Sequence, residues 1–188
     1  MSKYHKINGL YKRDKKGNFT WEFSQPEFDY LYDNTWIGHE KVDGTNIRAY
    51  LHFETAEVEI RGRTDNAQLH VDLVTAIKAK ILATGKIADV FDYDDIPEIC
   101  LYGEGIGPKI QKDIYKTGWD FVLFDINVNG WWLNQEDVKA IAEKLELSYA
   151  PEVFRGTLRD AEGVVKAGQI TKLGDTLNIS EGLVLPRS

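Results

Sequence analysis

The segment Glu40–Asn46 (E-K-V-D-G-T-N) contains the side chain of this sequence that is best suited to nucleophilic chemistry. Lys41 lies between the carboxylates of Glu40 and Asp43, and Gly44 follows. A lysine amine attacks only when it is unprotonated, and nearby cations, metal ions or desolvation can lower its pKa toward neutrality. A glycine here lets the backbone turn and a ligand approach closely. The plainer interpretation is a solvated loop with a Lys–Asp pair, since a K-x-D-G match arises by chance in roughly 2% of chains of this length.

Three later segments join a carboxylate or an aromatic side chain to an apolar run. Glu104 lies between two glycines in a G-x-G-x-G spacing followed by a proline, which differs from a dinucleotide-binding fingerprint. Residues 121–126 (F-V-L-F-D-I) form an aromatic run with an acid near its end, and Glu181 with Gly182 opens a final apolar run. Taken singly, these segments are typical of a tight turn and of core strands.

The pattern before residue 90 predicts the elements that must position Lys41. Residues 46–53 and 57–61 alternate apolar and polar side chains, which indicates two half-buried strands in a hairpin. Residues 66–83 change to helical spacing, with Asp65 or Asn66 as the N-terminal cap and Gly85 as the stop.

The second half of the chain continues this mixture. The apolar runs at 99–102 and 121–126 predict buried strands, and Asn129-Gly130 predicts a hairpin turn. Helices are expected to start near Asn134 and Thr157, and residues 183–185 predict a last strand. Because there are no regular β-α-β crossovers, the expected fold class is α+β, with antiparallel sheets flanked by helices.

The composition describes an ordinary globular chain. Its 188 residues (21.4 kDa) fit one domain, and no run of about 18 apolar residues predicts a membrane span. The single cysteine, Cys100, excludes an internal disulfide, and the basic N-terminus has no signal-peptide core, so a cytoplasmic location is expected. The four histidines show no ligand spacing and are expected at the surface or at edges. A net charge of −7 argues mildly against a nucleic-acid partner, although residues 1–16 carry a local excess of base.

Taken together and in order, the four segments resemble the motifs of the covalent nucleotidyltransferase superfamily of polynucleotide ligases and capping enzymes. Thr45-Asn46, residues 61–64 (R-G-R-T) and residues 105–112 (G-I-G-P-K-I-Q-K) are most similar to the RNA ligase 2-type family, which includes bacteriophage and trypanosome enzymes. The resemblance covers roughly residues 36–186. It implies a nucleotidyltransferase (ATP-grasp-like) domain and allows a phage or viral origin. Its four motifs correspond to Lys41–Gly44, Tyr102–Glu104, Phe121–Ile126 and Glu181–Val184.

The resemblance also implies a role for each matching residue. Lys41 would attack ATP and form a lysyl-AMP intermediate. Glu104 would bind the ribose hydroxyls, and Phe121 would stack on the adenine, with Phe124 as the fallback. The remaining nucleotide-binding residues that it implies are Glu40, which would help to read the adenine amine, Val42, and Asn46 and Arg63, which would contact the phosphate, the ribose or the incoming strand.

A divalent metal and a nucleic-acid substrate follow from the same resemblance. Glu181 and Asp43 would hold Mg²⁺, which is usually bound by one or two carboxylates together with phosphate oxygens. AMP would pass to an RNA 5′-phosphate, and a 3′-OH would displace it, most naturally in a nicked duplex. The alternatives are a DNA ligase, a GTP-using capping enzyme, or a catalytically dead module that binds nucleic-acid ends.

The sequence departs from the superfamily at its end. A fifth motif with two lysines (K-x-K) is typical after the fourth, whereas here seven residues follow Glu181, and Lys166 and Lys172 precede it. The expectation is therefore a single adenylyltransferase domain over residues 1–188, without this fifth motif and without a C-terminal domain. Two alternatives stay open: the sequence is truncated before the fifth motif, or its activation of ATP is compromised.

Overall fold

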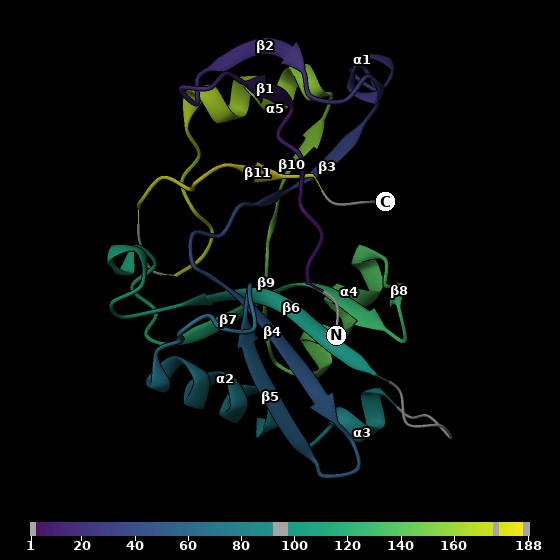
Figure 1. The fold of residues 1–188 in the computed structure, drawn as a ribbon, viewed down its shortest axis with the longest axis vertical. Coiled ribbons are helices and arrows are strands. Elements are labelled where there is room, and N and C mark those ends of the chain that lie inside the picture. The colour runs from purple at the N-terminus through teal and green to yellow at the C-terminus, as the bar shows by residue number, and fades with distance from the viewer. Residues whose placement is uncertain (1–2, 92–97, 175–176, 186–188) are drawn as a thin grey trace.

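The computed structural model describes residues 3–91, 98–174 and 177–185. Figure 1 shows two layers of sheet, a large one in the lower half of the view and a small one above it. The chain passes from the small sheet into the large one just after Glu40, so Lys41 lies where the two sheets meet.

The large sheet has six strands in the order β5-β4-β6-β7-β8, with β9 beside β7. All neighbouring strands in this sheet are antiparallel except β7 and β9, which are parallel. Its first pair confirms the predicted hairpin, and the turn at Asn129-Gly130 has positive φ at both residues, as a tight hairpin turn requires. The strands are β4 (Thr45–His52), β5 (Glu57–Gly62), β6 (Ile99–Ile106), β7 (Asp120–Val128), β8 (Trp131–Trp132) and β9 (Ser148–Tyr149).

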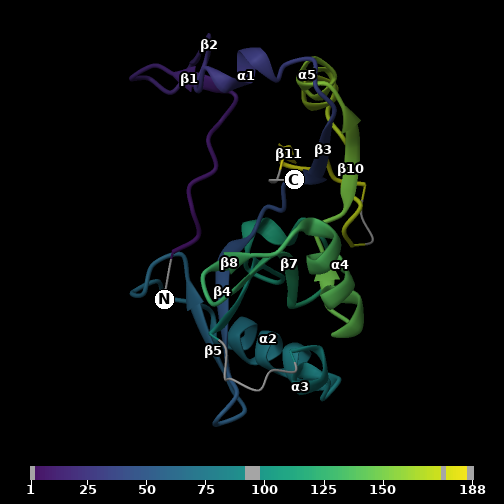
Figure 2. The ribbon, with the colours of Figure 1, turned by 90° about the vertical axis from the view of Figure 1, so that its right-hand side faces the viewer.

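Helices cover one face of this sheet and enclose the main hydrophobic core (Figure 2). The spacing of Leu73, Ile77 and Ile81 buries all three side chains completely. The helix that we expected near Asn66 begins at Val71 instead, because Asp65 pairs with Arg48 and His70 supplies the N-terminal cap. Asn134 caps the next long helix, as predicted. These helices are α2 (Val71–Ala83), α3 (Ile87–Val90) and α4 (Gln135–Lys144), and a 3-10 turn occupies Gln111–Asp113.

The small sheet places β3 between two antiparallel neighbours, in the order β10-β3-β11. Thr157 forms a reciprocal capping box with Asp160 at the start of the helix that follows β10, which confirms that predicted start. A two-stranded hairpin and a short helix precede β3 and lie near this helix in both views (Figures 1 and 2). The elements are β3 (Trp36–Glu40), β10 (Glu152–Gly156), β11 (Leu183–Val184), α5 (Leu158–Ala167), β1 (Tyr11–Arg13), β2 (Phe19–Phe23) and α1 (Glu27–Tyr30). No helix within the described ranges is long and apolar enough to cross a membrane.

Candidate active site

Lys41 meets Glu181 because two strands from opposite ends of the chain pair in the small sheet. Leu183 of β11 lies opposite Glu40 of β3, and the backbone N–H of Lys41 donates to the carbonyl of Gly182 over 2.9 Å. The Lys41 ammonium donates to the Glu181 carboxylate in an ion pair. Both side chains remain open to solvent, with 46% and 40% of their surface exposed. The first and fourth motifs therefore form one accessible pair.

The turn after Lys41 packs tightly against the large sheet. A Cβ added to Gly44 would lie 2.6 Å from the carbonyl oxygen of Gly105, so only glycine fits this approach. The N–H of Asp43 donates to the Tyr115 hydroxyl over 2.6 Å. Burial raises the pKa of the Asp43 carboxyl, and the nearby charge of Glu181 raises it further, while Lys41 opposes both effects. The glycine and tyrosine contacts thus fix the turn that carries a second carboxylate near Lys41.

Glu104 and Asn46 face the same site from the large sheet. The register of β4 against β6 places them opposite each other, with 3.5 Å between Asn46 Nδ2 and Glu104 Oε1. Burial raises the pKa of Glu104 to about 7, and the charges of Glu181 and Asp43 act in the same direction. The Asn46 Oδ1 atom is buried and has no hydrogen-bond partner within the described part of the chain. This pair therefore offers a carboxylate and an unsatisfied acceptor to a ligand with hydroxyl or N–H groups.

Phe121 is on the wrong face of β7 for the adenine stacking that we expected of it. Its ring is fully buried in the main core under the helices, and it lies against Gly103 so closely that a Cβ there would approach to 2.4 Å. Glu104 points to the opposite face, where β7 contributes Val122 and Phe124. Phe124 is half-buried and packs against both smaller apolar clusters of that face. The fallback aromatic residue, and not Phe121, therefore faces the site.

Glu40 is engaged inside the protein and is not open to a nucleotide. It is 1% exposed, its Oε1 accepts from the Thr171 hydroxyl, and its Oε2 accepts from the N–H of Lys172 over 2.8 Å. These two hydrogen bonds hold the segment that precedes β11 against β3. The carboxylate that we expected to help read the adenine amine instead holds the small sheet together.

The two remaining predicted site residues occupy different surroundings. Val42 is buried against Ile106 and Val122 in an apolar cluster beside the site, so it can form one wall of a base pocket. Arg63 follows β5 and is exposed, and no ion pair joins it to the other described residues. The structure places Arg63 just after the end of β5, without a contact that ties it to Lys41.

The comparisons with known proteins agree with this architecture. The sequence matches the RNA ligase family over residues 34–187. This chain belongs to the RNA ligase family. No curated protein matches it at a significant level.

Solved structures with the same fold include variants of Naegleria gruberi RNA ligase. One without ligand has 20% identity and a TM-score of 0.60, and one with ATP and Mn has 20% identity and a TM-score of 0.61. A third, with AMP and Mn, has 19% identity and a TM-score of 0.57. Each match covers 84% of this chain, which spans only 47–48% of the length of those ligases. The expected fold, a ligase-type nucleotidyltransferase domain with antiparallel sheets, is confirmed.

The sequence did not reveal that two polar residues close to the predicted site residues along the chain are buried. Arg48 is almost completely buried, and it donates to the carbonyl of Gly62 and pairs with Asp65 over 2.7 Å, so it fixes the end of β5 next to Arg63. His39 is buried against Tyr149 and is bonded to the Ala150 carbonyl, so our expectation of a surface or edge residue was wrong. The signal that could have revealed both is their position in central strands, where both faces are covered.

The acidic residues around Lys41 fit a divalent cation that is shared with a bound phosphate. The described residues contain no ready-made cluster of three metal-ligating side chains. Asp43 and Glu181 instead supply carboxylate oxygens; burial and, after it, the charge of Glu181 raise the pKa of Asp43, and a bound cation would offset both effects. This donor set suits Mg²⁺ or Mn²⁺, which complete their coordination with water and phosphate oxygens.

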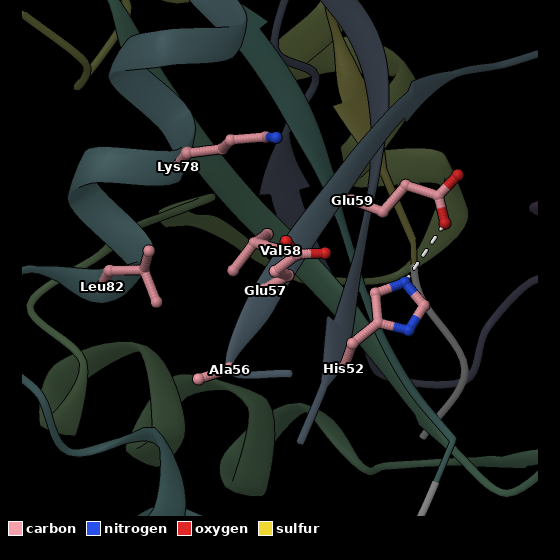
Figure 3. Close-up of a pocket in the computed structure, with 7 residues that line it drawn as sticks. All are labelled: His52, Ala56, Glu57, Val58, Glu59, Lys78 and Leu82. Atoms are coloured by element: carbon pink, nitrogen blue, oxygen red, sulfur yellow. Dashed lines mark hydrogen bonds and ion pairs between the residues drawn. The ribbon is translucent and has the colours of Figure 1, made fainter. Parts of the chain in front are cut away.

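A separate hollow of about 380 Å³ lies between the far end of the β4–β5 hairpin and α2 (Figure 3). It mixes acidic, basic and apolar side chains, and His52 bonds to Glu59 at its edge. None of the motif residues lines it, so this hollow is separate from the candidate site around Lys41. Its lining consists of His52, Ala56, Glu57, Val58, Glu59, Lys78 and Leu82.

Proposed function

We propose that this chain carries the adenylyltransferase activity of an ATP-dependent RNA ligase, with Lys41 as the nucleophile. The observation that carries the proposal is the ion pair of Lys41 with Glu181, close enough to the Asn46–Glu104 pair for the charge of Lys41 to act on the Glu104 carboxyl. Membership of the RNA ligase family supports RNA as the substrate. The Naegleria structures titled with ATP or AMP and Mn support an adenine nucleotide and a divalent metal.

The first step is transfer of AMP to Lys41. The Lys41 amine gives up its proton and attacks the α-phosphorus of ATP, so that an N–P bond forms while the P–O bond to the β-phosphate breaks and pyrophosphate leaves. Glu181 accepts a hydrogen bond from this amine and thereby orients it toward the phosphorus. Exposure of the pair leaves room for a triphosphate above it.

The nucleoside is held from the large sheet. Glu104, when ionised, accepts hydrogen bonds from the ribose hydroxyls, and the open Asn46 Oδ1 accepts one more. Phe124 and Val42 offer apolar contacts to the base from the same face. These contacts position the α-phosphate for in-line attack, which is a large part of what nucleotidyl transfer needs.

The next two steps join RNA ends. An oxygen of an RNA 5′-phosphate attacks the phosphorus of lysyl-AMP, the N–P bond breaks, and the Lys41 amine is released. A 3′-OH then attacks the 5′-phosphate and displaces AMP, which seals the strand, as in a nicked duplex. Asp43 and Glu181 would hold Mg²⁺, whose charge offsets the negative charge that develops on the phosphoryl oxygens.

Incubation with α-labelled ATP and a divalent metal tests this proposal. Label should remain on the denatured protein, should be absent from Lys41→Ala, and should not appear with α-labelled GTP. The labelled protein should then transfer AMP to 5′-phosphorylated RNA. Labelling with GTP alone would support a capping enzyme, transfer to DNA alone would support a DNA ligase, and no labelling at all would leave a binding module.

A further inference from the structure

An aromatic and basic surface lies on the β1–β2 hairpin, before the residues that match the ligase family. Phe19 and Trp21 remain 47% and 64% exposed, which is unusual for side chains of this size. Arg13 lies over the Phe19 ring at 4.1 Å, and Lys166 of α5 lies over the Trp21 ring at 5.6 Å. We refer to these four side chains as the hairpin platform.

The hairpin platform is held in a defined geometry. Tyr11, from the same face of the hairpin, contacts the Trp21 ring at 5.4 Å and stacks on Phe23. Its hydroxyl and that of Tyr32 both donate to Glu162 of α5, over 2.6 and 2.7 Å. The hairpin is therefore held against α5 by half-buried groups, and Phe19 and Trp21 remain exposed.

The backbone at Trp21 is a second, independent observation. Its φ is +63°, a left-handed conformation that a bulky residue rarely adopts. Such conformations persist where the surrounding structure enforces them, and they concentrate at binding sites. Here the conformation accompanies an exposed indole that lies under the Lys166 ammonium.

The charge around the platform selects its occupant. Residues 11–23, which form the hairpin, carry four basic and two acidic side chains, although the whole chain has a net charge of −7. The two acids are already engaged, since Glu22 pairs with Lys12 and Asp14 accepts backbone N–H groups of its own turn. Glu162, the acid nearest the platform on α5, is engaged by Tyr11, Tyr32 and Lys166. Exposed aromatic rings interleaved with cations match stacked bases and a phosphate backbone.

Strand β3 connects the site with the end of the molecule that carries the platform. β3 runs from Glu40, next to Lys41, to Trp36, whose indole donates to the Leu31 carbonyl just after α1. Strands rise about 3.3 Å per residue, so β3 separates its two ends by about 13 Å, and the hairpin lies beyond the Trp36 end. In Figures 1 and 2 the hairpin and α5 lie together at the end of the molecule beyond β3.

We infer that the hairpin platform binds unpaired nucleotides of the RNA substrate, by stacking of bases on Phe19 and Trp21 and by contact of Arg13 and Lys166 with phosphates. This inference rests on the proposed RNA ligase function. A paired helix offers its bases only at its ends, so the platform distinguishes single-stranded RNA from blunt duplex RNA.

Fluorescence anisotropy with the full chain tests this inference, with a labelled 5′-phosphorylated single-stranded RNA and a blunt RNA duplex as probes and without ATP. Phe19→Ala with Trp21→Ala should weaken binding of the single strand about tenfold or more and change duplex binding less than about twofold. Arg13→Gln should weaken binding of the single strand less than the double alanine variant does, and it should make that binding less dependent on salt concentration. Phe19→Tyr with Trp21→Phe, which keeps the rings, should restore most of the affinity.

Two controls make the test decisive. Lys12→Gln, on the opposite face of the hairpin, removes the same charge as Arg13→Gln and should leave binding nearly unchanged. Labelling of the denatured protein by ATP, which needs no RNA, should be equal in wild type and in all platform variants, so loss of the proposed enzyme activity and loss of the platform are read separately. Single-strand binding that survives the double alanine variant, or that falls equally with Lys12→Gln, would overturn the inference.

Discussion

Two carboxylates face Lys41 from opposite sheets, and their surroundings differ sharply. Glu181 comes from the small sheet, is 40% exposed and forms an ion pair with Lys41. Glu104 comes from the large sheet, is largely buried beside Asn46, and has a pKa raised to about 7. An exposed pair can change partners at little energetic cost, whereas a buried carboxylate stays in place and responds to its ligand through its charge. In the proposed function, the group that reacts lies beside the small sheet, and the groups that bind the nucleotide lie on the large sheet.

The largest expected effect is that of a substitution at Lys41 on labelling by ATP. Lys41→Arg keeps a cation next to Glu181, so the fold and its melting temperature should change little. A guanidinium stays protonated and cannot act as the nucleophile, so labelling by ATP should fall to background. Protein-bound label in this variant would show that another residue accepts AMP and would end the assignment of Lys41.

The two faces of β7 extend the comparison from carboxylates to aromatic rings. Phe121→Ala should lower the free energy of unfolding by about 3–5 kcal/mol, because the ring fills the main core. Phe124→Ala should destabilise less and should instead raise the ATP concentration needed for half-maximal labelling. Urea unfolding and labelling kinetics of the two variants measure this contrast, and a specific nucleotide defect in a stable Phe121 variant would reverse the assignment of faces.

The next largest expected effect is that of Glu104→Gln on ATP binding. Hydrogen bonds to a charged group contribute about 1.5–3 kcal/mol, so the variant should bind ATP about 10- to 100-fold more weakly above pH 7. Wild-type affinity should rise with pH through about 7, as Glu104 ionises, and the variant should lack this rise. Titration of ATP binding between pH 6 and 8 gives both results, and parallel curves would argue against a role for this carboxylate.

The same substitution should have the opposite effect on stability. The folded-state pKa of Glu104 is raised above its ordinary value of 4.5, so the folded protein favours the protonated form, and stability is lost as pH rises through about 7. Glutamine removes that loss. Glu104→Gln should therefore match wild type near pH 4.5 and be about 1–3 kcal/mol more stable at pH 8 in urea unfolding, and equal stability at pH 8 would show that burial costs this carboxylate little.

The smallest expected effect is that of Glu181→Gln on the fold. An exposed ion pair contributes at most about 1 kcal/mol, so the change in unfolding free energy should stay within that limit and shrink with added salt. Labelling by ATP should nevertheless slow, because the amine loses its orienting acceptor. A large loss of stability would mean that Glu181 is a structural residue like Glu40.

The sequence was sufficient for the elements that carry the motifs and insufficient for the directions of some side chains. Alternation at 46–53 and 57–61 and the cap at Thr157 predicted their elements, and the order of motifs predicted that Lys41 and Glu181 belong to one site. The run at Phe121–Ile126 begins with four apolar residues and so lacks the alternation that distinguishes the two faces of a strand. The sequence therefore could not show whether Phe121 or Phe124 faces the helices. The register shift between Tyr102 and Gly103 adds to that ambiguity.

Long-range packing accounts for the other errors. Glu40 is buried because Thr171 and Lys172, more than 130 residues away, donate to it, and no local pattern encodes that contact. The same holds for His39, which bonds to the carbonyl of Ala150. Helix α2 begins at Val71, later than expected, because Asp65 pairs with Arg48 of β4.

Mapping the site of AMP attachment tests the central claim most directly. The full chain is incubated with ATP and Mg²⁺ or Mn²⁺, digested under conditions that preserve a phosphoramidate, and its peptides are sequenced by mass spectrometry. One AMP per chain on Lys41 is the predicted result. AMP on any other residue, or a chain that ligates RNA without an adduct on Lys41, would contradict the account.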